Sequence, residues 1–194
     1  AIQAAKLGKR AAVIERREIV GGVTAHTGTI PSKTLREAVL YLCGWREKGI
    51  YGRSHRVKAD ITAGDLLERL HITVRHEIEI IQHQLSRNGV QVISGLAKFL
   101  DPHTVQVTNA TGHTADYRAK AIVIATGTVP HRPSNIPFDD ETIIDSDGLL
   151  QIKTIPRSMV VIGAGVIGVE YATIFSALDA RITLIDSRDT ILDF

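Results

Sequence analysis

Residues 159–186 read MVVIGAGVIGVEYATIFSALDARITLID and contain the pattern that decides the fold. They begin with a short β-branched stretch typical of a buried parallel strand. Gly163, Gly165 and Gly168 follow in the spacing G-x-G-x-x-G, and the residues after them have helical composition. A second β-branched stretch then ends at Asp186. Strand, glycine turn, helix, strand and terminal acid in this order predict a dinucleotide-binding βαβ unit.

The three glycines each have a physical reason. The first permits a tight turn, the second lets the backbone approach a pyrophosphate, and the third lets the helix pack close to the strand. The helix then begins near Val166 and Ile167, where unpaired N–H groups and the positive end of the helix dipole would meet the phosphates. Asp186 would accept hydrogen bonds from a ribose diol. A glycine-rich packing turn without a ligand is the alternative.

Arg188 allows two interpretations. An arginine two residues after the ribose acid can meet a 2′-phosphate, whereas Asp186 would repel one. The pair would suit an enzyme that accepts both NAD and NADP. An exposed arginine with no ligand is the alternative.

The beginning of the chain repeats the second half of this unit. LGKRAAVIE at residues 7–15 aligns with LDARITLID at residues 178–186, and the alignment places Glu15 on Asp186. The opening residues 1–8 would then be the end of a helix. A first strand and glycine turn are expected upstream of them, so we expect the chain to be a fragment of a larger enzyme.

Two further helices are expected in the middle of the chain. The first covers residues 32–45, with Pro31 at its entry and Ser32 as its cap. The second is a long amphipathic helix over residues 63–87, which Asn88-Gly89 ends as a left-handed cap.

Short strands follow the long helix. Alternating polarity predicts antiparallel strands at residues 90–95, 97–100, 104–109 and 113–120, with turns at Asp101-Pro102 and Thr111-Gly112. The apolar stretch AIVIATG at residues 121–127 indicates another buried parallel strand. Residues 128–140 are rich in proline and are expected to form a loop between domains.

Composition narrows the class of protein. The chain has 194 residues, of which 44% are hydrophobic and 23% charged, as in globular proteins. A net charge of +2 gives no argument for a nucleic acid or a membrane as partner. The eight histidines lack metal-ligand spacing, so no metal is expected. Cys43 is the single cysteine, which excludes an internal disulfide and favours a buried thiol and a cytoplasmic setting.

Four features together resemble the flavoprotein disulfide reductase family. They are Glu15, the stretch GGVTAHTGTIPSK at residues 21–33, ATG at residues 125–127, and the second glycine motif. The resemblance implies an α/β fold with FAD- and NAD(P)-binding Rossmann-like domains, made of parallel sheets with helices plus a small antiparallel β-meander. It implies an N-terminally incomplete FAD-binding domain over residues 1–150 and the start of an NAD(P)-binding domain over residues 151–194. It also implies a homodimer or a higher homo-oligomer for the whole enzyme.

The stretch 21–33 departs from the redox-active members of that family. Those members carry cysteines at the positions of Thr24 and Thr29, and threonine cannot form a disulfide relay. HTGTIPSKTLREAV, GAGVIGVEYATIF and DSRDTIL are most similar to members that carry hydride from NADPH through FAD to NAD+. Even those members keep a cysteine at the first position, so Thr24 departs from their pattern too.

The resemblance implies the following roles. Lys33 and Glu170 would be the catalytic residues, paired beside the flavin, where a cation stabilises negative charge. Two solvated helix charges are the alternative. FAD would be held by Glu15, Arg16, Gly21, Gly22, Thr24, Thr29, Lys33, Ala97, Thr126 and Gly127. NAD and NADP would be held by Gly163, Gly165, Val166, Ile167, Gly168, Glu170, Asp186 and Arg188.

Two other functions stay open at this point. One is a disulfide-reducing member such as dihydrolipoyl dehydrogenase, against which the missing cysteines weigh. The other is a non-catalytic nucleotide-binding fragment, because a chain without the first glycine turn is expected to hold FAD poorly and to purify colourless.

Overall fold

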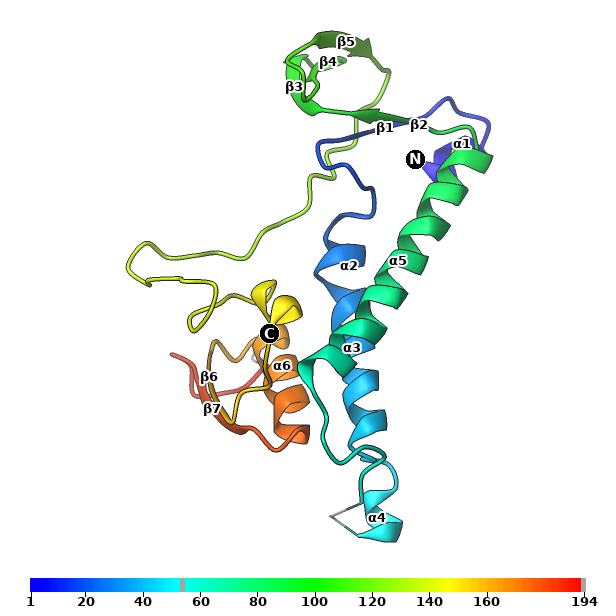
Figure 1. The fold of residues 1–194 in the computed structure, drawn as a ribbon. Coiled ribbons are helices and arrows are strands. Elements are labelled where there is room, and N and C mark those ends of the chain that lie inside the picture. Colours follow the sequence, from blue (N-terminus) through cyan, green and yellow to red (C-terminus); the bar gives the residue numbers. More distant parts are fainter. Residues whose placement is uncertain (53–54, 193–194) are drawn as a thin grey trace. The chain divides into compact units, whose positions relative to one another are not determined.

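The computed structural model of the chain describes residues 1–52 and 55–192 (Figure 1). The chain divides into two compact units. Unit 1 contains residues 1–22 and 75–127, and unit 2 contains residues 23–74 and 128–194. The domain boundary predicted at residue 150 concerns the whole protein and stays a prediction.

Unit 1 contains a two-stranded parallel sheet and a three-stranded antiparallel sheet. Its elements are α1 (Ile2–Lys6), β1 (Ala12–Glu15), the second half of α5 (Ala63–Arg87), β2 (Gln91–Ser94), β3 (Leu96–Asp101), β4 (Thr104–Thr108) and β5 (Thr114–Arg118). The predicted helix end and strand over residues 1–15 are confirmed, since α1 leads into β1.

The predicted partner of residues 90–95 is wrong. β2 pairs in parallel with β1, with Val13 opposite Val92, rather than joining the antiparallel strands. Gly95 separates β2 from β3 with a φ of +154°, which lets the chain change direction at that point. Because the choice of partner depends on distant residues, alternation alone did not reveal it.

The other antiparallel strands and their turns are confirmed. β3, β4 and β5 pair in chain order. Asp101 accepts the His103 N–H at 2.7 Å in the first turn, and Asn109 accepts the Thr111 N–H at 3.0 Å in the second. These are side-chain turns of the kind that Asp and Asn favour.

The predicted buried strand over residues 121–127 is also wrong. These residues form no strand, and the Val123 side chain is 87% exposed. A strand requires a hydrogen-bonded neighbour, and none of the described strands pairs with this segment. The Val123 and Ile124 side chains therefore remain exposed.

Unit 2 is built from helices and one βαβ unit. Its elements are most of α2 (Gly22–His26), α3 (Thr29–Leu42), α4 (Lys48–Tyr51), the first half of α5, the 3-10 helix η1 (Gly148–Gln151), β6 (Ser158–Ile162), α6 (Val166–Ala177) and β7 (Arg181–Ile185). β6 and β7 pair in parallel, and α6 packs against both, as Figure 1 shows. The βαβ prediction for residues 159–186 is confirmed.

The helix predicted over residues 32–45 begins and ends earlier. α3 has Gly28 at its N-cap position, so Pro31 lies in the first turn, where a missing N–H costs nothing. Ser32 is not the cap, because its hydroxyl contacts the Thr29 carbonyl at 3.4 Å. Residues 22–26, expected in a loop, form α2.

The long helix α5 is confirmed over residues 63–87, and Gly89 follows it with a φ of +65°. Its start carries a feature that we did not predict. The Asp65 carboxylate accepts the Thr62 N–H at 2.8 Å, and the Thr62 hydroxyl accepts the Asp65 N–H at 3.2 Å. This reciprocal pair satisfies two backbone donors at the helix entrance.

The two units have hydrophobic cores of different size. The core of unit 2 joins α3, α5, η1 and α6, and Phe175 lies at its centre with 0% exposure. Cys43 is buried in the same core, as predicted, and its thiol is free. Among the described residues of unit 1, Val20, Leu85 and Val90 form one small buried cluster with partly buried neighbours, and Val105 and Val107 are buried on β4.

Candidate functional site: the glycine turn and the Lys33–Glu170 pair

The glycine turn of unit 2 lies between β6 and α6. Gly163 has a φ of +108°, a conformation that side chains disfavour. A Cβ on Gly168 would lie 1.9 Å from the Gly163 carbonyl oxygen, so only glycine fits there. Gly163 therefore permits the tight turn and Gly168 the close packing of helix on strand, as the sequence predicted.

Gly165 has a different environment. It is the N-cap residue of α6, and a Cβ placed on it would meet nothing within 4 Å. The next two residues, Val166 and Ile167, are exposed. Open space at the start of this helix fits a pyrophosphate, which would meet backbone N–H groups and the positive helix end. The residues present thus fit a dinucleotide.

Asp186 directly follows β7, beside this turn. Its Oδ2 accepts the Ala164 N–H at 2.5 Å, and its Oδ1 accepts the Arg188 N–H at 2.9 Å. The Arg188 guanidinium binds both carboxylate oxygens, through Nε at 3.0 Å and Nη2 at 3.2 Å. Arg188 and the two backbone donors hold the pKa of Asp186 well below its usual range.

Lys33 and Glu170 lie on α3 and α6, which pack against each other within unit 2. The Lys33 Nζ is 2.5 Å from the Glu170 Oε1. The Lys33 side chain is 60% exposed and that of Glu170 is 15% exposed, so the pair presents its cationic end outward. The structure therefore brings together the two predicted catalytic residues.

Tyr171 follows Glu170 and is buried in the core of unit 2. Burial raises its pKa, and the nearby carboxylates of Glu170 and Asp147 act in the same direction. Its hydroxyl has no hydrogen-bond partner among the described residues. No signal in the sequence indicated an unpaired hydroxyl at this position.

Thr24 and Thr29 are both exposed. Thr24 lies on α2, and Thr29 is the first residue of α3. Neither hydroxyl can replace a thiol in electron transfer. The fold around these positions is therefore kept without the sulfur chemistry that cysteines would supply.

The other predicted FAD residues lie in unit 1. Glu15 ends β1, and its Oε1 accepts the Arg17 N–H at 3.0 Å. Gly21, Gly22 and Gly127 have φ values of +126°, +60° and +72°, which suit tight backbone turns. The remaining three are Arg16, which follows β1, Ala97 on β3, and Thr126 in the extended segment. Their roles are taken up below as proposals.

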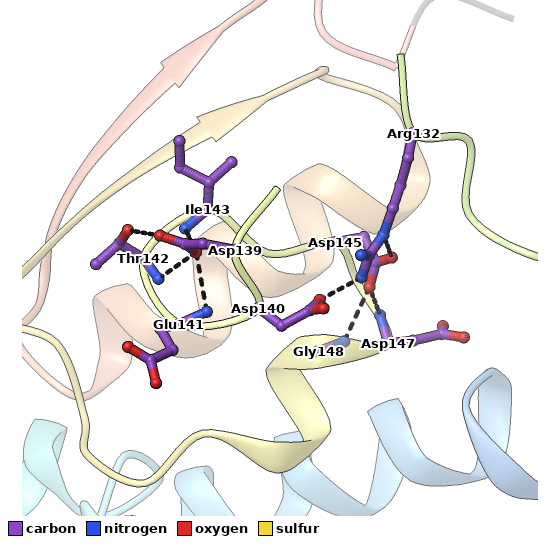
Figure 2. Close-up of polar contacts among 9 residues, drawn as sticks. All are labelled: Arg132, Asp139, Asp140, Glu141, Thr142, Ile143, Asp145, Asp147 and Gly148. Carbon is purple, nitrogen blue, oxygen red and sulfur yellow. Dashed lines mark hydrogen bonds and ion pairs between the residues drawn. The ribbon is translucent and has the colours of Figure 1, made fainter. Parts of the chain in front are cut away.

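The sequence predicted a proline-rich connection before η1. In the structure, the carboxylates of Asp139, Asp140 and Asp145 accept hydrogen bonds from other residues of this loop (Figure 2). Arg132 binds Asp145 through Nε at 2.7 Å and Asp140 through Nη2 at 2.5 Å. Asp139 accepts three backbone N–H groups, from Glu141, Thr142 and Ile143. A hollow of about 580 Å³ lies here, and none of its lining residues belongs to the predicted site.

Within residues 1–52 and 55–192, no helix is long and apolar enough to cross a membrane. No group of three or more His, Cys, Asp or Glu residues there could hold a metal ion.

The sequence profile of one family, described as pyridine nucleotide-disulphide oxidoreductase, matches residues 1–194. The chain belongs to this family. It is 51% identical over 199 residues to a soluble pyridine nucleotide transhydrogenase of Mycobacterium bovis, covering 100% of this chain and 42% of that protein. It is 38% identical over 194 residues to a protein of the same name from Colwellia psychrerythraea, covering 100% and 41%. The chain thus spans about two fifths of the length of these curated relatives.

Solved structures agree with the predicted fold. LpdA from Mycobacterium tuberculosis superposes with a TM-score of 0.86 at 24% identity, over 100% of this chain and 42% of that one. The HOCl-induced flavoprotein disulfide reductase RclA from Escherichia coli gives 0.78 at 26% identity, over 99% and 40%. The α/β fold class and the membership of the family are confirmed.

Proposed function

We propose that the whole protein transfers hydride between NADPH and NAD+ with FAD as its cofactor, as a transhydrogenase that uses no redox-active disulfide. The observation that carries the proposal is the Lys33–Glu170 ion pair, formed across 137 residues of sequence, beside a stretch with threonine at both cysteine positions. The names of the curated relatives support the same activity.

The glycine turn of unit 2 would hold the nicotinamide nucleotide. Gly165 leaves room for the pyrophosphate, and the exposed first turn of α6 at Val166 and Ile167 provides backbone donors. Asp186 and Arg188 would meet the adenosine ribose. Gly163 and Gly168 act on the shape of the turn rather than on the ligand.

FAD would be held by the residues that the family resemblance indicates. Glu15 would accept hydrogen bonds from the adenosine ribose, with Arg16 beside it and the Ala97 backbone near the adenine. The FAD-binding residues proposed for tight turns or contacts near the flavin are Gly21, Gly22, Thr24, Thr29, Thr126 and Gly127. The flavin supplies reversible acceptance of a hydride from one nicotinamide and its donation to the next.

The proposed role of the chain's own residues is to hold a positive charge in position and to stabilise the negative charge that develops beside it. Lys33 presents a positive charge where negative charge develops, and this stabilisation costs no reorganisation if the ammonium is already held. Glu170 holds it, because its largely buried carboxylate fixes the Nζ at 2.5 Å. The exposed end of Lys33 stays accessible to a cofactor.

A homo-oligomer and a cytoplasmic location are further proposals for the whole protein. They rest on the family to which the chain belongs and on a single, buried cysteine that forms no disulfide. Size-exclusion chromatography with light scattering and cell fractionation would test them.

The activity is tested by comparing acceptors in one preparation of the whole protein. NADPH is supplied as donor, and thio-NAD+, lipoamide and glutathione disulfide are supplied in turn as acceptors. We expect turnover with thio-NAD+ and none with either disulfide, because no cysteine pair can accept electrons at residues 24 and 29. Turnover with a disulfide alone would favour a disulfide reductase, and binding without turnover would favour a non-catalytic nucleotide-binding protein.

A further inference from the structure

The hydrogen-bonding positions of the Asp186 carboxylate are all occupied in this structure. A carboxylate offers about four hydrogen-bonding positions. The Ala164 N–H, the Arg188 N–H and two guanidinium nitrogens of Arg188 supply four donors at 2.5–3.2 Å. A ribose hydroxyl therefore has no position on Asp186 until one of these donors leaves.

The donor that can leave is the Arg188 guanidinium. The two backbone N–H groups are fixed by the glycine turn and by the residue order after β7. The Arg188 side chain is 42% exposed, whereas that of Asp186 is 12% exposed. The pair thus consists of a fixed, covered acid and an arginine whose outer edge faces solvent.

We infer that the Asp186–Arg188 ion pair is a latch that distinguishes NADP from NAD by the group at the ribose 2′ position. This inference rests on the proposed nucleotide site. A 2′-phosphate binds the Arg188 guanidinium, for which it competes with Asp186. A 2′-hydroxyl binds Asp186 itself, which requires Arg188 to swing away. Each nucleotide uses one member of the same ion pair.

The latch predicts an asymmetry between the two nucleotides. A phosphate dianion can approach the exposed guanidinium and form charge-assisted bonds while the pair is only partly opened. The hydroxyl must first break a two-point ion pair. The remaining charge of Asp186 repels the phosphate and keeps the preference small enough for both nucleotides to bind. Because the contacts are exposed, salt would reduce the preference for the phosphate.

Binding of two adenylates to the whole protein with its flavin in place tests the latch. The probes are 2′,5′-ADP and 5′-AMP, measured by isothermal titration calorimetry. Arg188→Ala is expected to raise the Kd of 2′,5′-ADP about thirtyfold and to lower that of 5′-AMP about threefold, because it removes the phosphate partner and frees the acid. Asp186→Asn is expected to shift both constants in the opposite directions.

Two further variants keep the result interpretable. Arg181→Ala removes an exposed arginine at the other end of β7 and is expected to leave both constants unchanged. Arg188→Lys keeps the charge but loses the two-point geometry, so 5′-AMP should bind more tightly while 2′,5′-ADP loses less than about fivefold.

The outcomes separate the inference from the proposed function. If Arg188→Ala weakens both probes equally, or leaves 5′-AMP unchanged, the latch is overturned while the nucleotide site stands. If neither probe binds the unmodified protein, the nucleotide site is overturned and the latch with it. A gain for 5′-AMP together with a loss for 2′,5′-ADP supports the latch.

Discussion

Both units of the chain end a parallel strand in an acidic residue, but the two acids have different surroundings. Glu15 is the last residue of β1 and accepts the N–H of Arg17, and Asp186 directly follows β7 and accepts the N–H of Arg188. Asp186 also binds the glycine turn and the guanidinium of Arg188. The repeated sequence therefore builds the same strand end twice, and the glycine turn of unit 2 adds a second anchor for its acid.

The hydrophobic core is also larger in unit 2 than in unit 1. The strands of unit 2 are covered by α6, which brings Phe175 and its neighbours into a large core. The parallel strands of unit 1 pack against a smaller buried cluster of Val20, Leu85 and Val90. A closed strand–turn–helix–strand arrangement thus supplies both the anchored acid and the burial that supports it. We expect the two units to differ in local stability and in sensitivity to substitution.

Phe175→Ala should give the largest change. Removing a side chain with 0% exposure leaves a cavity in unit 2, with an expected loss of about 4 kcal/mol. Val90→Ala removes a smaller side chain from the small core of unit 1 and should cost about 1 to 2 kcal/mol. Native-state hydrogen exchange of amides in α6 and β2 measures each loss locally. Equal losses would show that the cores do not differ in packing.

Gly168→Ala should be nearly as damaging, because its Cβ would overlap the Gly163 carbonyl oxygen at 1.9 Å. The backbone must move, and about 3 kcal/mol of stability should be lost. Gly165→Ala meets open space and should cost less than about 1 kcal/mol, as a poorer N-cap. Its methyl group should instead weaken binding of 5′-AMP and 2′,5′-ADP. Chemical unfolding and calorimetry on both variants would show whether stability and binding separate in this way.

Asp186→Asn should have a smaller effect that depends on pH. Hydrogen bonds to Arg188 and Ala164 lower the pKa of Asp186 in the folded protein. Its stabilisation is thus present above the unfolded pKa of about 3.9 and is lost as pH falls toward the folded pKa. The variant should be less stable than the unmodified chain at pH 7, and the difference should shrink below about pH 4. Thermal unfolding of both proteins at pH values from about 3 to about 7 would measure this difference in stability.

Glu15→Gln is the matched control for that experiment. Glu15 accepts a backbone N–H but forms no ion pair like that of Asp186 with any residue in 1–52 or 55–192, so the change should be smaller across the same pH range. A larger effect of Glu15→Gln than of Asp186→Asn would mean that the glycine turn adds nothing to the anchoring of the acid.

Local patterns in the sequence predicted the parts of the fold that depend on neighbours in the chain. The G-x-G-x-x-G spacing located the turn before α6, and the apolar period of residues 63–87 located α5. Strand pairing depends on distant residues, so the parallel partner of β2 and the uncovered state of residues 121–127 were missed. α2 was missed because its glycines suggested a loop.

The site residues also divide into those that local sequence patterns predict and those that depend on distant contacts. The glycines and Asp186 were predicted from spacing alone. The Lys33–Glu170 pair was predicted from the family resemblance, because no local pattern relates two residues 137 positions apart. The four donors on Asp186 were not foreseen, since the conformation of Arg188 and the position of the Ala164 N–H follow from the folded turn.

In the proposed function, hydride exchange without sulfur would depend on the Lys33–Glu170 pair, and replacement of this pair gives the most direct test. Lys33→Met and Glu170→Gln are made in the whole protein, with Glu37→Gln on the exposed face of α3 as the control. Steady-state rates of NADPH-to-thio-NAD+ transfer and unfolding midpoints are measured together.

We predict that both pair variants lose about a hundredfold in kcat, since each removes preorganised charge. The control should keep its rate, and because Lys33 is exposed, stability should change by less than about 1 kcal/mol in the pair variants. An unchanged kcat in Lys33→Met and Glu170→Gln would contradict the account.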